Sequence, residues 1–93
     1  MEIEQYNTES NGFFKAMEGY DEAGVMTYTW ADNGNMLIDH TETNPSFSGK
    51  GIGTSLVMKA VKYAREQNVK IHPLCTFAKS VFDSNPDLHD VLV

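Results

Sequence analysis

Three glycines at alternate positions precede a helical pattern in the segment Ser46–Ala64, SFSGKGIGTSLVMKAVKYA. After Gly49, Gly51 and Gly53, apolar residues recur at spacings of three and four as far as Ala64, as the buried side of a helix requires. The first turn of a helix carries backbone N–H groups without partners in the helix, at the positive end of its dipole. Glycines let an anion approach these groups because they have no Cβ atom. The segment therefore predicts a phosphate-binding loop, and the alternative is a glycine-rich turn that only starts the helix.

The residues before this loop are expected to form strands joined by turns. Apolar, aromatic and β-branched residues lie between clusters of Gly, Asn and Asp, a pattern typical of strands. The pattern predicts three strands, Gly12–Met17, Ala23–Ala31 and Met36–Thr43. Strict alternation along the third strand would place four side chains on one face of the sheet: Met36, Ile38, His40 and Glu42.

The residues after the loop are expected to form a helix, a strand and a second helix. The helix spans Ile52–Asn68, the strand Val69–Leu74, and the short C-terminal helix Thr76–Asn85, which ends before Pro86. A strand, loop, helix and strand in this order form a crossover between parallel strands, so Met36–Thr43 should lie beside the later strand. The expected fold class is α/β (α+β): a mainly antiparallel sheet of about five strands, with one parallel βαβ crossover and a short C-terminal helix.

Size and charge narrow the partners that the chain can have. Its 93 residues suffice for one domain, residues 1–93, and the formal net charge of −6 opposes binding to nucleic acid. The N-terminus shows no signal-peptide pattern and no apolar run reaches membrane-spanning length, so we expect a cytoplasmic protein without a membrane partner. The single cysteine, Cys75, cannot form an internal disulfide. The apolar tail Leu92–Val93 either caps the core or contacts a second copy, which leaves a homodimer open.

Two common nucleotide loops and a metal site do not fit the sequence. A nucleoside-triphosphate loop requires Gly-Lys-Ser/Thr, whereas Lys50 is followed by Gly51. The dinucleotide fingerprint requires a third glycine where this chain has Thr54. No metal site is expected, because no pair at the usual zinc spacing occurs among the candidate ligands His40, His72, Cys75 and His89.

The hexapeptide SGKGIG, Ser48–Gly53, resembles the pyrophosphate loop of the GNAT acetyltransferase superfamily, Gln/Arg-x-x-Gly-x-Gly/Ala. Ser48 stands where glutamine or arginine is usual. The order of the expected elements is also similar, most of all to small single-domain GNAT-like proteins. In that superfamily the pantetheine arm of acetyl-coenzyme A lies between the strand before the loop and the strand after the helix, here Ile38–Thr43 and Val69–Leu74. The resemblance implies acetyl-coenzyme A as co-substrate, bound by Ile38, Thr41, Thr43, Ser48, Gly49, Lys50, Gly51, Ile52, Gly53, Thr54 and Cys75.

The resemblance also implies transfer of the acetyl group to an amine, either a small cationic amine or a lysine side chain. A protonated amine must lose a proton before it attacks the thioester, so the reaction needs a base. Glu42 is the first candidate by resemblance, and His40 is the second because imidazole groups titrate nearer to neutral pH than carboxylates. The backbone N–H groups of Thr41–Thr43 are expected to hold the carbonyl oxygen as negative charge develops there.

Two departures from the superfamily leave other functions open. Many members carry a tyrosine that protonates the departing thiolate, and Phe82 stands at that position here. Cys75 stands where asparagine is frequent, and three roles are open for it: an acyl-accepting nucleophile, a proton donor to the thiolate, or a small buried residue without chemistry. The alternative functions are a non-catalytic acyl-coenzyme A sensor or carrier, and an interaction domain that has lost the ligand.

Overall fold

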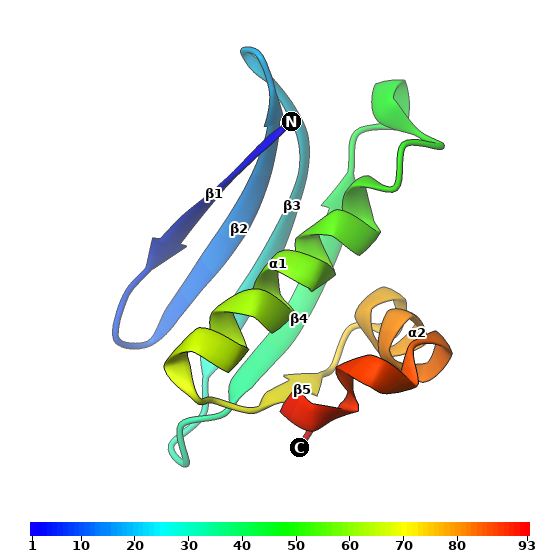
Figure 1. Ribbon diagram of the computed structural model, residues 1–93. Coiled ribbons are helices and arrows are strands. Elements are labelled where there is room, and N and C mark those ends of the chain that lie inside the picture. Colours follow the sequence, from blue (N-terminus) through cyan, green and yellow to red (C-terminus); the bar gives the residue numbers. More distant parts are fainter.

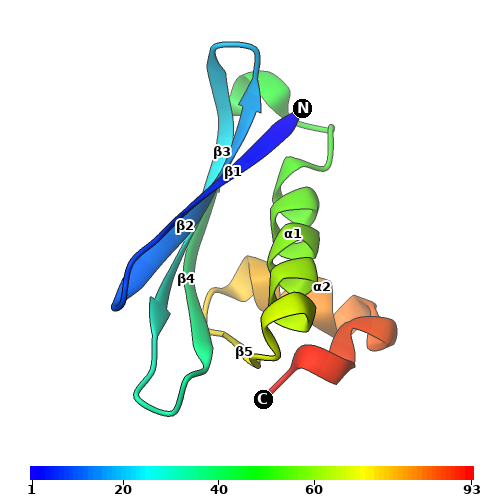
Figure 2. The same ribbon diagram turned by 60° about the vertical axis from the view of Figure 1, so that its left-hand side comes forward.

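The computed structural model describes residues 1–93, which form a five-stranded sheet covered by helices on one side (Figures 1 and 2). The strands lie in sequence order: β1 Glu2–Asn7, β2 Asn11–Glu18, β3 Asp21–Trp30, β4 Met36–Thr43 and β5 Ile71–Pro73. The helices are α1 Ile52–Gln67, α2 Thr76–Ser84, and the short 3-10 helices η1 Pro45–Phe47 and η2 Pro86–Val91. Strands β1 to β4 pair antiparallel, and β4 pairs with β5 in parallel. The predicted fold class and the crossover are therefore confirmed.

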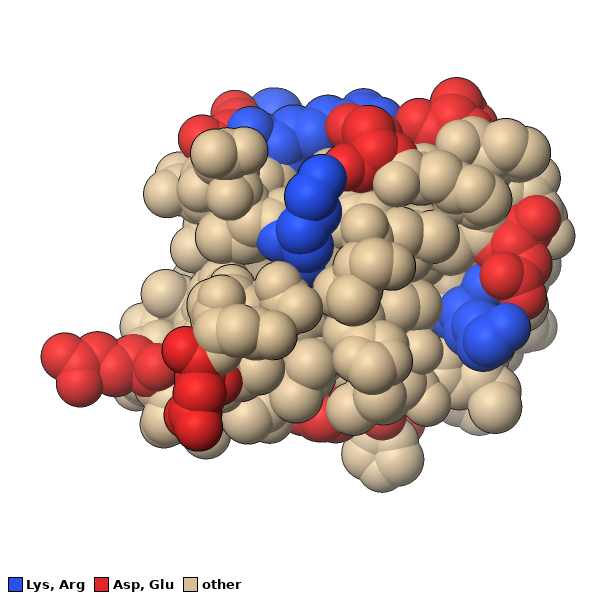
Figure 3. Space-filling view, turned by 90° about the horizontal axis from the view of Figure 1, so that it is seen from below, with Lys and Arg blue, Asp and Glu red and all other residues tan.

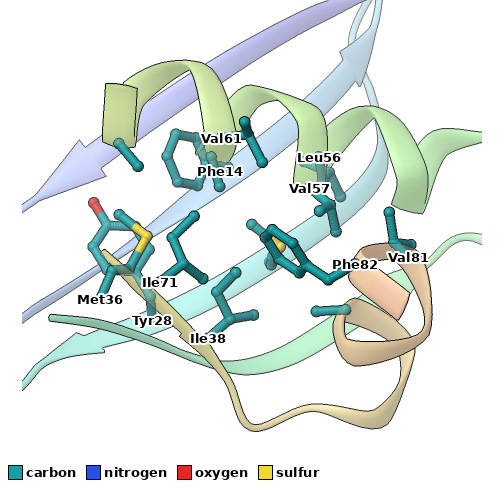
Figure 4. Packing of buried hydrophobic residues seen from close by; sticks show 14 of the residues in the cluster. Phe14, Tyr28, Met36, Ile38, Leu56, Val57, Val61, Ile71, Val81 and Phe82 are labelled. Atoms are coloured by element: carbon teal, nitrogen blue, oxygen red, sulfur yellow. The ribbon is translucent and has the colours of Figure 1, made fainter. Parts of the chain in front are cut away.

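The buried core lies between the sheet and the helices α1 and α2. Leu56 and Val61 of α1 point toward Phe14 and Ile38 of the sheet, and Phe82 of α2 closes the core from the side (Figure 4). Each of these side chains is at most 1% exposed. The opposite face of the sheet carries no helix (Figure 2). The glycine loop therefore enters α1 at one end of the only covered face of the sheet.

Strand β1 is missing from the sequence prediction. On this edge strand only Ile3 is partly buried, so no alternation of apolar residues marks it. Polar side chains attach it to the sheet: Gln5 Nε2 donates to the Tyr28 hydroxyl at 2.9 Å, and that hydroxyl donates to Asn7 Oδ1 at 2.8 Å. Burial raises the pKa of the Tyr28 phenol and so favours the protonated form that donates to Asn7.

A bulge in β4 overturns the prediction that Met36, Ile38, His40 and Glu42 share one face. Tyr28 of β3 pairs with Ile38 and the preceding Thr27 pairs with His40, which leaves Asp39 without an opposite residue. One extra residue reverses the alternation of all that follow it in the strand. Met36 and Ile38 thus point into the core, whereas His40 and Glu42 share the uncovered face with Thr27.

Charged side chains tie the C-terminal segment to α1. Arg65 donates from Nε and Nη2 to the two carboxylate oxygens of Asp90, at 3.0 and 2.8 Å, and from Nη2 to the Asp87 carbonyl at 3.0 Å. The hydrogen bonds from Arg65 lower the pKa of Asp90, and the same pair raises the pKa of Arg65. On the face seen from below, basic side chains lie beside acidic ones along the upper edge and on the right, and one basic side chain extends toward the middle of the face (Figure 3). None of the helices combines the length and the apolar composition that a membrane span needs.

The Arg65–Asp90 pair predicts a pH-dependent contribution to stability. Because the pKa of Asp90 is lower in the folded protein, the contribution is present at neutral pH and is lost as the pH falls through that pKa. Urea unfolding should show Asp90→Asn to be less stable than the parent protein at pH 7, with the difference vanishing in acid. In the double-mutant cycle, Arg65→Gln should add little to Asp90→Asn. A difference that persists unchanged in acid would show that the carboxylate charge is not involved.

Candidate functional site

The loop before α1 is fixed to the sheet at one end and turns sharply at the other. Asn44 donates from its backbone N–H to the Ala23 carbonyl of β3 at 2.8 Å, and its side-chain oxygen accepts from Ser46 N–H at 3.0 Å. Gly49 and Gly51 then adopt left-handed backbone angles, with φ of +81° and +69°. A residue with a side chain rarely adopts this region, so both positions favour glycine for the backbone itself. A Cβ atom at either position would meet no protein atom within 4 Å.

The backbone N–H groups at the start of α1 have no partners. Gly51 is the N-cap, no side chain caps the helix, and the first helical hydrogen bond runs from Ser55 N–H to the Gly51 carbonyl. None of the N–H groups of residues 49–54 donates to an acceptor in the protein. Helices commonly satisfy these groups with a capping side chain, and here they stay free for an acceptor from outside.

A pocket of about 290 Å³ lies over these groups. Its lining consists of Thr41, Thr43, Phe47, Ser48, Gly49, Gly51, Ile52, Gly53, Thr54 and Phe77. The chain has 13 acidic residues, and the lining contains none of them. In a protein of net charge −6, a concave surface free of carboxylates and lined by amides suits an anion.

Most of the residues predicted to bind the co-substrate line this pocket, and three do not. Ile38 is fully buried in the core. Lys50 is exposed, with Nζ 5.4 Å from the centre of the Phe47 ring. Cys75 lies beside the pocket, with Sγ 3.4 Å from Thr41 Oγ1. Their roles in binding stay predictions.

The strands β4 and β5 diverge next to the pocket. They pair only over Met36–Ile38 and Ile71–Pro73, and the Ile38 carbonyl then accepts from both Leu74 N–H and Cys75 N–H, at 3.0 and 3.1 Å. Beyond Ile38 no strand covers the outer edge of β4. Because Asn44 N–H points toward β3, alternation directs the N–H groups of Thr41 and Thr43 toward this open edge. The predicted cleft between the two strands thus has a structural counterpart.

Cys75 has a structural function in addition to its place beside the cleft. It is the N-cap of α2, and its sulfur accepts from Ala78 N–H at 3.4 Å. The thiol is partly exposed. Contact with Thr41 places the sulfur across the point where β4 and β5 separate. A role in chemistry and a role as a cap are therefore both compatible with this position.

The two candidate bases lie on the far side of β4 from the pocket. Glu42 and His40 pair with Val25 and Thr27, on the uncovered face, whereas Thr41 and Thr43 point toward α1. Glu42 lines a separate cavity of about 310 Å³ that shares Thr43 with the first. Neither base reaches into the anion pocket itself, so either could act only on a molecule that approaches from the uncovered face.

Two aromatic residues of the pocket are missing from the sequence prediction. Phe47 comes from η1 and Phe77 from the first turn of α2. Phe77 is 40% exposed, and its ring lies against Gly53. Its position two residues after Cys75 was the only signal in the sequence that could have indicated it. Phe82, at the position of the superfamily tyrosine, is 1% exposed and belongs to the core (Figure 4). No group of three His, Cys, Asp or Glu side chains is arranged to hold a metal ion.

Comparisons with known proteins agree with this geometry. Residues 12–91 match the family model described as GCN5-related N-acetyl-transferase. The chain is 23% identical to Protein NATD1 of Xenopus tropicalis over 82 residues, which cover 88% of this chain and 75% of that protein. Protein NATD1 of Mus musculus is 22% identical over 82 residues, 88% of this chain and 74% of that protein. A GCN5-like protein of Staphylococcus aureus, solved by NMR, superimposes with a TM-score of 0.74 at 31% identity, covering 97% of this chain and 87% of that one.

The left-handed N-cap predicts a specific ranking of substitutions at Gly51. Gly51→Ala should lower the free energy of unfolding by about 1 to 2 kcal/mol, because alanine at positive φ is strained although no atom lies nearby. Gly51→Asn should cost less, since asparagine tolerates the left-handed region. Urea unfolding of both variants measures the difference. Equal losses for alanine and asparagine would contradict the left-handed geometry at this position.

Proposed function

The chain belongs to the GCN5-related N-acetyltransferase family, and on this premise we propose that it transfers the acetyl group of acetyl-coenzyme A to an amine. The observation that supports the proposal most is the carboxylate-free pocket over the unpartnered N–H groups of residues 49–54. Family membership alone supports N-acetyltransferase activity in general terms. The pocket supports the specific co-substrate, because a diphosphate is the anion that this ligand would present there.

The diphosphate of coenzyme A fits the start of α1 in charge and in hydrogen bonding. Its oxygens accept hydrogen bonds and cannot donate them, and residues 49–54 offer donors that the protein leaves unused. The positive end of the helix dipole adds a favourable field. Lys50 is exposed beside Phe47 and belongs to the same loop, so its ammonium group can approach the same phosphates. These residues would bind the donor and take no part in the bond exchange.

The thioester would lie where β4 and β5 diverge. From the pocket, the path to the open edge of β4 passes Thr43 and then Thr41. The N–H groups of these residues point toward that edge, so they can donate to the thioester carbonyl oxygen as negative charge develops on it. Acetyl-coenzyme A supplies the activated acyl group, and the chain holds the thioester in place and donates hydrogen bonds to it.

The reaction itself exchanges one bond to the acetyl carbon for another. The neutral amine nitrogen attacks the carbonyl carbon, the C–N bond forms and the C–S bond breaks. The sulfur leaves as a thiolate, and the proton that the attacking nitrogen loses as it becomes an amide passes to this thiolate. Before the attack the ammonium proton must pass to a base, and keeping the amine neutral at pH 7 costs roughly 4 to 5 kcal/mol. Glu42, with His40 as the alternative, can take this proton from an amine on the uncovered face of β4.

Cys75 carries the single thiol of the chain and lies at the divergence of the strands. As a proton donor it would protonate the departing thiolate, and as a nucleophile it would carry the acetyl group before the amine does. Phe82 cannot replace the superfamily tyrosine, because it has no hydroxyl and is buried in the core. This substitution favours the second candidate function, a non-catalytic acyl-coenzyme A sensor or carrier. The net charge of −6 supports a cationic acceptor, either a small amine or a lysine side chain.

The proposal predicts that the protein releases coenzyme A from acetyl-coenzyme A when an amine is present. Thiol release should be measured with spermidine and with a lysine-containing peptide, alongside thermal unfolding with coenzyme A, ATP and NAD. Coenzyme A at about 100 times its dissociation constant should stabilise the fold by roughly 2.7 kcal/mol. Stabilisation without amine-dependent thiol release would indicate the sensor or carrier. No stabilisation by coenzyme A would contradict both functions.

Variants of the candidate residues assign the roles. Glu42→Gln should lower kcat/KM by about 10² to 10⁴ and flatten its rise with pH if Glu42 is the base. The matched control is Glu4→Gln, since Glu4 is an exposed carboxylate on the distant strand β1. If Glu42→Gln has no effect, His40→Ala should show the loss instead. An acetyl adduct in the intact mass that disappears in Cys75→Ala would identify a covalent intermediate.

A further inference from the structure

Phe77 occupies an unusual position for an aromatic side chain. The residue is 40% exposed, although its ring lies against Gly53 in the first turn of α1. It lines the pocket over the free N–H groups together with Thr41 and Thr43. Met58 is an apolar residue of comparable exposure, but it lies on α1 outside the pocket. Phe77 therefore offers an apolar surface at a polar site.

Gly53 lacks a side chain for a different reason from the other two glycines of the loop. Its φ lies outside the left-handed region, so its backbone suits any residue. A Cβ atom at Gly53 would come within 2.7 Å of both Cε2 and Cζ of Phe77. The corresponding Cβ atoms at Gly49 and Gly51 would meet nothing. Gly53 thus makes room for an aromatic ring, whereas Gly49 and Gly51 serve the turn.

We propose that Phe77 binds the pantoyl part of coenzyme A, the carbon with two methyl groups that follows the diphosphate. Gly53 has no side chain, so the Phe77 ring can occupy the position from which it contacts this group. This inference rests on the proposed function, because it needs coenzyme A in the pocket. It assigns an affinity-determining residue that the sequence motif does not contain. The ring covers the ligand and exchanges no proton or acyl group.

The order of groups in the pocket supports this assignment. Coenzyme A runs from the diphosphate through a methylene group to the dimethyl carbon, and from there along two amides to the sulfur. The pocket runs from the N–H groups of residues 49–54, past the Phe77 ring on Gly53, to Thr41 and the Cys75 thiol. The only strongly apolar unit of the ligand arm therefore meets the ring when the diphosphate meets the helix. When the two methyl groups pack against the ring, apolar surface of both the ligand and Phe77 is removed from water, which favours binding.

A double-mutant cycle tests the inference. The dissociation constants of coenzyme A and of 4′-phosphopantetheine should be measured by calorimetry for the parent protein, Phe77→Ala, Gly53→Ala and the double variant. Phe77→Ala should weaken both ligands alike, by about tenfold, as expected for two methyl groups that lose their cover. Gly53→Ala should also weaken both, because it displaces the ring, and this loss should disappear in the Phe77→Ala background.

Three controls distinguish a contact with the pantoyl group from a contact with the nucleotide and from a general loss of stability. The affinity for 3′-phospho-ADP, which lacks the pantoyl group, should be the same in Phe77→Ala and the parent. Met58→Ala, at 42% exposure outside the pocket, should leave all affinities unchanged. Phe77→Leu keeps an apolar side chain and should retain part of the affinity, and thermal unfolding of each variant verifies the fold.

Several results would overturn the inference. An unchanged coenzyme A affinity in Phe77→Ala would exclude the contact. An equal loss for 3′-phospho-ADP would place the ring on the nucleotide instead. A loss from Gly53→Ala that persists without the ring would show that the glycine is bare for the phosphates. In each of these cases the parent still binds coenzyme A and the proposed function stands, whereas failure of the parent to bind coenzyme A would overturn both.

Discussion

The left-handed backbone of Gly51 determines where α1 begins, and the site depends on this position. Because Gly51 is a cap without a side chain, no hydroxyl or carboxylate satisfies the first N–H groups of the helix. Asn44 fixes the other end of the loop to β3, so the free donors are held in place relative to the sheet. The resulting donors lie together and are unsatisfied, the arrangement in which backbone amides bind an anion. The remaining features of the pocket follow from what lies around this point.

The bulge at Asp39 determines which side chains of β4 face the pocket and which face the uncovered side of the sheet. Without it, the residues after Ile38 would keep the core-facing alternation, and Glu42 would point toward α1. With it, Thr41 and Thr43 face the pocket while His40 and Glu42 face the uncovered side of the sheet. In the proposed function, donor and acceptor meet through the gap between β4 and β5 from opposite faces. The absence of a helix on the uncovered face leaves room for acceptors of different size (Figure 2).

Local patterns in the sequence were sufficient to predict the glycine loop, the helix α1 and the bounds of β4. Glycine at positive φ and helical periodicity depend on neighbouring residues, so they can be recognised without the fold. The bulge could not be predicted, because it arises from the register between β3 and β4 and not from the composition of either strand. The same holds for Phe77, whose contact with Gly53 joins residues 24 positions apart, and for β1, an edge strand without a buried face. Pairing between strands and packing between helices join residues that are far apart in the chain, so local patterns could not predict them.

The most direct test of the account is an NMR titration of the backbone amides with coenzyme A. The account predicts the largest shift changes at the N–H groups of residues 49–54, with further changes at Thr41 and Thr43, because these amides gain acceptors that they lack in the free protein. The amides of β1, on the far edge of the sheet, should remain unchanged. Changes that spare residues 49–54 and cluster elsewhere would contradict the claim that the start of α1 holds the diphosphate.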